Sequence, residues 1–290
     1  MGAVLINATE RLAEALAAVR AGDRRKAAEL ADSADCPLGT ELALHLRGSA
    51  GREVYSQPDA FTAFIRGGQN VALYEALADR LAARYAELTV STLLDVGCGD
   101  GMALVPALER ATTRPATVGL IEPSEALLTA AVERLAGLPV EVRSWGTGVL
   151  EYLAADAGKW TLAQSTFALQ SLPPDARLAA LRGLRERCDA VLIAEFDIPD
   201  IDVDSDEYLT SLARRYQRGL EQYPDNARLV AQGFLLPMLL GQAAPLTGAN
   251  NWEQPAAAWV DQLRAAGFTE VSVEPLAEYW WSPAVVVNAA

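Results

Sequence analysis

The sequence predicts an α/β protein with a mostly parallel sheet and a helical N-terminal segment. Residues 92–196 alternate between short apolar runs and helical patterns, which is typical of a parallel sheet covered by helices on both faces. Residues 1–88 carry helical patterns only. A glycine-rich turn, "LLDVGCGDG", closes the first apolar run, where a ligand can approach the backbone of such a sheet closely.

The N-terminal segment is expected to consist of several helices separated by glycines. The predicted helices are 8–34, broken near Gly22, then 37–47 with Pro37 near its start, and about 70–87 after a Gly67–Gly68 break. We therefore expect a helical segment at residues 1–88 and a sheet domain at residues 89–290.

Within the sheet domain the strands and helices follow one another in order. The predicted strands are 92–97, 116–123, 140–145, 160–166 and 189–196, and the predicted helices are 101–111, 124–136, 147–154 and 175–187. The crossovers between these strands should be right-handed. A helix at 255–266 and two strand-like runs, "TEVSVEPLAEYW" and "SPAVVVNA", follow near the C-terminus.

Residues 197–254 interrupt this alternation. They begin with an acidic stretch, "DIPDIDVDSDE", and continue with helical patterns. A connection of more than 50 residues is long and is usually functional, so we expect a helical lid over the substrate. Residues 234–240 are strongly apolar, which favours lid core or a homodimer surface over substrate contacts.

The charge of the chain disfavours two classes of partner. The 24 basic and 38 acidic side chains give a formal net charge of −14, which repels nucleic acid and anionic lipid. The basic strips at 20–26 and 177–187 contain or adjoin acids and are interpreted as solvated helix faces. The N-terminus does not resemble a signal peptide and no apolar run is long enough for a bilayer, so we expect a cytoplasmic protein.

Cysteine and histidine contribute little to the predicted chemistry. The three cysteines have no metal-like spacing, so no metal site is expected. The single histidine, His45, lies on an apolar helical pattern, where packing is the more frequent role. General base catalysis by histidine is therefore poorly supported.

The glycine turn and two acids indicate the kind of ligand. Gly97, Gly99 and Gly101 follow a G-x-G-x-G spacing, whereas a dinucleotide site has G-x-G-x-x-G. Asp95 precedes these glycines, and a carboxylate there suits a cationic ligand better than a diphosphate. Glu122 ends the second strand, where a carboxylate can accept both hydroxyls of a ribose. The pattern therefore favours a cationic nucleoside.

Several segments together resemble the class I S-adenosylmethionine-dependent methyltransferases. They are "LLDVGCGDG", "VGLIEPS", "WTLAQSTFALQSLPPDARLAALRGL", "GFTEVSVEPL" and "SPAVVVNA", in the order that this family has. The resemblance implies a Rossmann-like sheet of seven strands whose last strand is antiparallel. It also implies S-adenosylmethionine as the methyl donor and S-adenosylhomocysteine as the product.

The resemblance also implies roles for individual residues. Gly97 and Gly99 would approach the methionine portion, Asp95 its amino group, and Glu122 the ribose. The chain departs from the family after the third strand, where no aspartate is available for the adenine. Ser144 or Trp145 would serve instead, and Trp145 is left open between stacking on the base and core packing. The expected donor-binding set is Asp95, Gly97, Cys98, Gly99, Glu122, Pro123, Ser144, Trp145 and Gln164.

Catalytic and substrate residues are expected outside the glycine turn. Many small-molecule members have a tyrosine before the sheet domain that covers the donor, and Tyr55 is the candidate here. Glu195, at the end of the fifth strand, is the candidate general base. The expected substrate-binding set is Arg66, Asn70, Phe167, Gln170, Asn251, Trp252 and Trp280, although ordinary packing accounts equally well for any single aromatic residue.

The sequence thus predicts a methyltransferase for a small organic acceptor, such as a secondary-metabolite intermediate. Methyl transfer from a sulfonium is an in-line displacement that depends mainly on alignment, so O-, N- and C-methylation all stay open. Three alternatives remain at this stage: an S-adenosylmethionine-binding cyclase or sensor, a nicotinamide oxidoreductase, and a methyltransferase acting on proteins or peptides.

Overall fold

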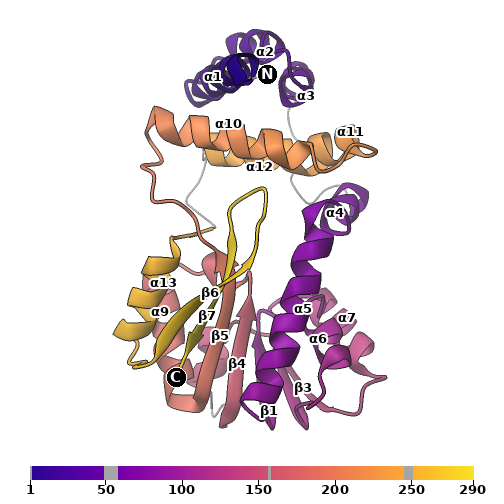
Figure 1. The fold of residues 1–290 in the computed structure, drawn as a ribbon, viewed down its shortest axis with the longest axis vertical. Coiled ribbons are helices and arrows are strands. Elements are labelled where there is room, and N and C mark those ends of the chain that lie inside the picture. Colours follow the sequence, from indigo (N-terminus) through magenta and orange to yellow (C-terminus); the bar gives the residue numbers. More distant parts are fainter. Residues whose placement is uncertain (1, 49–57, 156–157, 245–250) are drawn as a thin grey trace. The chain divides into compact units, whose positions relative to one another are not determined.

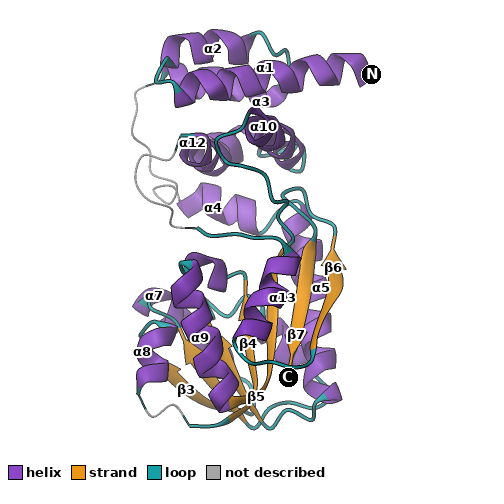
Figure 2. Ribbon diagram, turned by 90° about the vertical axis from the view of Figure 1, so that its left-hand side faces the viewer, coloured by secondary structure: helices purple, strands orange, loops and turns teal. Residues whose placement is uncertain are grey.

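The computed structural model describes residues 2–48, 58–155, 158–244 and 251–290 (Figures 1 and 2). These residues form two compact units. One unit comprises residues 1–71 and 200–249, and the other comprises residues 72–199 and 250–290. The division falls inside helix α5 (Gln69–Glu87), so most of this helix belongs to the unit that holds the sheet. Each unit is described by itself.

The sheet unit contains seven strands in the order β3-β2-β1-β4-β5-β7-β6. Six strands run in one direction and β7 runs antiparallel to both of its neighbours, which confirms the predicted fold class. The strands are β1 (Thr92–Val96), β2 (Thr117–Ile121), β3 (Glu141–Trp145), β4 (Trp160–Thr166), β5 (Cys188–Phe196), β6 (Val271–Ala277) and β7 (Ala284–Ala289).

Two hydrophobic cores cover the two faces of this sheet, as the alternation of strands and helices predicts. Successive strand residues point to opposite faces. Leu93 and Leu162 therefore join the core beneath α5, α6 (Leu104–Arg110) and α7 (Glu125–Leu135). Leu94 and Ala163 join the core beneath α8 (Val149–Ala154), α9 (Pro174–Arg187) and α13 (Ala256–Ala265). Helices on both faces explain why the central strands are apolar along their whole length.

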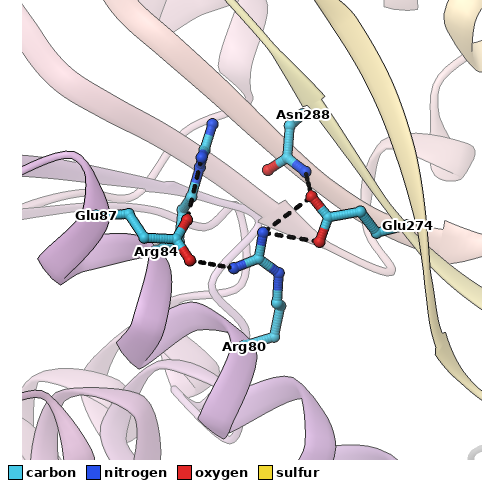
Figure 3. Close-up of polar contacts among 5 residues, drawn as sticks. All are labelled: Arg80, Arg84, Glu87, Glu274 and Asn288. Atoms are coloured by element: carbon cyan, nitrogen blue, oxygen red, sulfur yellow. Dashed lines mark hydrogen bonds and ion pairs between the residues drawn. The ribbon is translucent and has the colours of Figure 1, made fainter.

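A cluster of charged side chains joins α5 to strands β6 and β7 (Figure 3). Arg80 lies 2.8 Å from Glu274 and 3.0 Å from Glu87, and Arg84 lies 3.2 Å from the same Glu87. The Asn288 amide donates a hydrogen bond of 2.9 Å to Glu274. These contacts hold α5 against β6 and β7, and the apolar side chains of α5 pack under the central strands.

The helical unit is built from two chain segments far apart in sequence. Its helices are α1 (Gly2–Arg20), α2 (Arg24–Asp32), α3 (Pro37–Arg47), α4 (Pro58–Ile65), α10 (Asp206–Leu220), α11 (Ala227–Val230), the π-helical turn η2 (Ala231–Leu235) and α12 (Leu236–Ala243). The predicted break at Gly22 is confirmed, since φ there is +77° between α1 and α2. None of the described helices in either unit is long and apolar enough to cross a membrane.

The single histidine has a packing role in the helical unit. His45 Nδ1 lies 3.0 Å from Gln232 Oε1, and the Gln232 amide donates to the Glu41 carboxylate at 2.6 Å. Phe234 of the same π-helical turn is buried and stacks on Phe64, with ring centroids 4.0 Å apart. Part of the apolar run 234–240 is thus core of this unit.

Candidate ligand-binding site

The site lies at the carboxyl ends of the parallel strands, where the strand order reverses between β1 and β4. Loops that leave adjacent strands in opposite directions open a crevice at such a point, and ligands of open α/β sheets bind there. Gly97 follows β1 and Phe167 follows β4, so the turns after these two strands border the crevice.

The glycine turn combines one glycine that the protein's own packing requires with one that faces open space. Gly97 has φ +70°, and a Cβ there would lie 2.5 Å from the Cβ of Ala168 in the loop after β4. Gly99 has φ +54°, and a Cβ there would meet nothing within 4 Å. Gly97 therefore lets two loops of the protein approach each other, whereas Gly99 leaves room for a ligand.

Glu122 connects the end of β2 to this turn. One carboxylate oxygen accepts the Gly99 N–H at 3.1 Å, and the other accepts the Ser124 N–H at 2.9 Å. The neighbouring Pro123 is exposed. Because each carboxylate oxygen offers two lone pairs, Glu122 can hold the turn and still accept hydroxyls from a sugar.

Asp95 is a buried acid, only 1% exposed, near the end of β1. Burial raises the pKa of Asp95 to about 7, Gln164 opposes that rise, and the charge of Glu122 adds to it. Asp95 Oδ1 accepts no hydrogen bond from any residue that the structure describes. Nor does any described lysine, arginine or histidine form an ion pair with Asp95 or Glu122. Two acids without a protein cation suit a positively charged ligand and oppose a diphosphate.

Two further residues of the predicted donor-binding set are buried beside Asp95. Cys98 donates a long hydrogen bond of 3.5 Å to the Gly99 carbonyl, and burial raises the pKa of its thiol. Gln164 is fully buried on β4 as the register partner of Asp95, and it accepts a hydrogen bond of 2.7 Å from the Tyr85 hydroxyl. Sequence reasoning missed Tyr85, although its spacing after Leu77 and Leu81 places all three on one face of the helix.

Ser144 and Trp145 occupy the end of β3 and point to opposite faces of the sheet. Ser144 is exposed. Trp145 packs edge-on against Tyr152 and Trp160, with ring centroids 4.8 and 6.2 Å away. Its carbonyl accepts the Glu122 N–H at 3.2 Å. The structure therefore gives Trp145 a packing role, and stacking on an adenine stays a prediction.

A row of aromatic rings follows the carboxyl ends of β4 and β5. Phe167 stacks on Phe196 at 4.7 Å, and Phe196 stacks on Tyr279 at 5.0 Å, with planes inclined by 22° and 20°. Tyr74 of α5 meets Phe167 edge-on at 6.3 Å. Phe167 has φ +53°, a conformation that costs a non-glycine residue about 1 kcal/mol or more and persists only when its surroundings hold it.

Gln170 holds the loop that carries Phe167. Its side-chain amide donates to the Phe167 carbonyl at 2.7 Å, and its own carbonyl accepts the Trp252 N–H at 2.7 Å. The backbone N–H of Gln170 donates a hydrogen bond of 3.4 Å to the Glu195 carboxylate. Burial raises the pKa of Glu195 well above the usual range, Glu253 adds to this, and Arg177 opposes it. Glu195 is thus enclosed beneath the loop.

The other predicted residues are distributed between the two units. Trp280 is buried between Tyr279 and Trp281, and Asn251 is exposed. Arg66 and Asn70 belong to the helical unit, where Arg66 is exposed and the Asn70 amide donates to the Phe64 carbonyl at 2.9 Å. Tyr55 lies outside the described residues. The described part of the chain holds no group of three histidine, cysteine or acidic side chains that could bind a metal ion.

Comparison with solved structures identifies the fold. The S-adenosylmethionine-dependent methyltransferase SibL, in its apo form, is 18% identical with a TM-score of 0.55, and the match covers 94% of this chain and 76% of that one. Magnesium protoporphyrin IX methyltransferase from Synechocystis PCC 6803, with bound S-adenosylhomocysteine, is 16% identical with a TM-score of 0.51, over 80% and 92%. The mitomycin 7-O-methyltransferase MmcR is 15% identical with a TM-score of 0.51, over 92% and 70%.

The chain thus has the fold of the class I S-adenosylmethionine-dependent methyltransferases. At these identities the likeness concerns the fold alone. No protein-family model matches the sequence, and no curated protein matches it either.

Proposed function

We propose that the protein transfers a methyl group from S-adenosylmethionine to a small organic acceptor. The observation that carries this proposal is the pair of acids at the ends of β1 and β2. Glu122 binds the Gly99 N–H beside the open space at that residue, and Asp95 is buried on β1 two residues before the glycine turn. Neither acid forms an ion pair with a described cation. A nucleoside that carries an ammonium group and a sulfonium supplies the missing positive charge.

Different residues of the site would bind different parts of this donor. Asp95 would receive the ammonium group, Glu122 the ribose hydroxyls, and the backbone at Gly97 and Gly99 would approach the methionine portion. When bound, the donor supplies an electrophilic methyl group on sulfur. The protein then has to align the acceptor with that methyl group and exclude water, which can account for much of the rate enhancement.

The aromatic row supports an apolar organic acceptor. Phe167 and Phe196 are partly exposed at the strand ends on the α5 face, the face that also carries Asp95. Two solved structures with this fold, mitomycin 7-O-methyltransferase and magnesium protoporphyrin IX methyltransferase, are by name enzymes of small molecules. An acidic chain of charge −14 is a poor partner for nucleic acid.

Calorimetry with S-adenosylhomocysteine tests the donor site, with NAD as the competing ligand. We expect S-adenosylhomocysteine to bind and NAD not to bind. Asp95→Asn and Glu122→Gln should each weaken binding about 10- to 100-fold, since hydrogen bonds to charged groups contribute about 1.5–3 kcal/mol. Glu125→Gln, at an exposed acid close to Glu122, is the matched control and should leave the affinity unchanged. Binding of NAD alone would overturn the proposal.

Transfer of a labelled methyl group to a panel of small phenols, carboxylic acids and amines tests the activity itself. Incorporation of label into any of them supports the proposal. Tight donor binding without transfer to any class of acceptor, proteins included, would instead favour a cyclase or a sensor. The role of residues 197–254 as a lid stays a prediction, and protection of this segment from proteolysis by the bound donor would support it.

A further inference from the structure

A buried polar cluster lies beneath the glycine turn, on the face of the sheet that α5 covers. Tyr85 and Gln164 are fully buried, and Asp95 is 1% exposed. These three residues come from α5, β4 and β1. Polar side chains in a core otherwise made of leucine, valine and alanine are costly unless each atom finds a partner.

The hydrogen bonds of the cluster determine which way the Gln164 amide points. Tyr85 donates its hydroxyl to Gln164 Oε1 at 2.7 Å. The Nε2 end of the amide must then point away from Tyr85. Asp95 is the register partner of Gln164 on the neighbouring strand, and Gln164 lowers the pKa of Asp95. The hydrogen bond from Tyr85 thus orients the Gln164 side chain so that its amide N–H groups point toward Asp95.

The polar atoms on the Asp95 side are not satisfied by the described residues. Gln164 Nε2 and Asp95 Oδ1 make no hydrogen bond of ideal geometry with any described residue, although Gln164 lies near enough to Asp95 to lower its pKa as a hydrogen-bond donor. The cluster is therefore complete at the Tyr85 end and incomplete at the end that borders the glycine turn.

The groups around Asp95 indicate that a positively charged ligand would complete the polar cluster. The titratable groups that face Asp95 are Tyr85 from α5, Cys98 from the glycine turn and Glu122 after β2. All three are acids, so none of them can neutralise a carboxylate. Burial among such groups makes Asp95 retain its proton up to about pH 7 in the free protein.

We propose that Tyr85 and Gln164 are positioning residues that hold Asp95 for the ammonium group of a cationic ligand, and that binding of this ligand releases the proton that Asp95 carries in the free protein. The inference rests on the proposed function, because it takes the methyl donor and its product as the ligand. The step is balanced: the carboxylic acid loses its proton to solvent, and the carboxylate receives the charged ammonium group.

Calorimetry with S-adenosylhomocysteine in two buffers of different ionisation enthalpy measures the released proton. Between about pH 5.5 and 7.5 the ligand's amino group stays charged, so the protein alone titrates. We expect close to one proton released per ligand at the lower end of this range. The affinity should fall about tenfold for each pH unit below about 7. The nucleoside 5′-methylthioadenosine lacks the ammonium group, and its affinity should not fall in this way.

Two substitutions test the positioning residues. Gln164→Leu removes the group that favours the Asp95 carboxylate, so the pH at which affinity is half-maximal should rise. A rise of about one unit weakens binding at pH 7 about fivefold. Tyr85→Phe removes one oxygen and preserves the packing, so it keeps the test possible even where Gln164→Leu does not fold. It should shift the same pH midpoint in the same direction by a smaller amount.

Tyr216→Phe is the matched control. Tyr216 is also fully buried and donates to a glutamine, Gln242, at 2.7 Å, but it lies in the helical unit. It should leave the pH midpoint unchanged. Affinity that is independent of pH, with no proton released, would overturn this inference while leaving the proposed function intact. Unchanged midpoints in both Tyr85→Phe and Gln164→Leu would show that these residues do not position Asp95. Absence of S-adenosylhomocysteine binding to the wild-type protein would overturn the proposed function.

Discussion

Replacement of the two glycines at 97 and 99 by alanine should separate folding from ligand binding. Both have positive φ, which costs an L-residue about 1–2 kcal/mol. In Gly97→Ala the new Cβ would also lie 2.5 Å from the Ala168 Cβ, and overpacking of this kind costs a further 1–3 kcal/mol or so. The free energy of unfolding should therefore fall by about 2–5 kcal/mol.

Gly99→Ala should behave differently, because its Cβ would meet no protein atom within 4 Å. Only the cost of positive φ remains, so the free energy of unfolding should fall by about 1–2 kcal/mol. The same methyl group would occupy space that the donor needs, and we expect the affinity for S-adenosylhomocysteine to fall at least tenfold or so. Gly22→Ala has a φ of +77° and equally open surroundings in the helical unit, which makes it the control for backbone strain.

Urea unfolding and calorimetry on the three variants measure these two quantities. In addition, Ala168→Gly should recover part of the stability lost in Gly97→Ala, because it removes the atom that the new Cβ meets. Wild-type affinity in Gly99→Ala would show that the turn does not approach the ligand. Equal stability losses at positions 97 and 99 would refute the steric part of the argument.

Three other substitutions test the surroundings of the site. Burial raises the pKa of Glu195 above its unfolded value of about 4.5, so the folded state binds more protons and this group costs stability as pH rises above that value. Glu195→Gln should then be more stable than the wild type in urea at pH 7 but not at pH 4. Arg177→Met removes three partly buried hydrogen bonds and should lower the melting temperature, at a cost of about 2 kcal/mol or more. The Trp252 carbonyl and Gln254 Oε1 lose the Arg177 donor, whereas Gln262 Oε1 still accepts from the Gln254 amide. Glu274→Gln breaks the partly exposed ion pair with Arg80 and should cost only about 1 kcal/mol in urea unfolding.

Much of the fold was predictable because it depends on local patterns. Alternating apolar runs and helical periodicity predicted every central strand and the helices that cover them. Asp95 and Glu122 were also found from their positions alone, since each lies at or just beyond the end of a recognisable strand. The carboxyl ends of parallel strands lie at one edge of a sheet, so the topology brings these acids to the same site.

Other features could not be predicted, because they depend on which distant side chains meet. Tyr85 and Gln164 are 79 residues apart, and nothing in either local pattern indicates their hydrogen bond. The stack of Phe167, Phe196 and Tyr279 joins three separate loops and strands in the same way. Residues 200–249 were expected as an insertion, and only the structure shows that they build one compact unit with the N-terminal helices.

The parallel sheet, the glycine turn and the positions of the two acids follow from the amino-acid sequence alone, because backbone conformation and strand ends depend on nearby residues. The protonation state of Asp95 depends on the folded structure. The burial of Asp95 and the surrounding groups set its pKa, and these depend on helices and strands that pack together from across the chain. The charge that a buried carboxyl carries is therefore a property of the folded protein rather than of the motif that contains it.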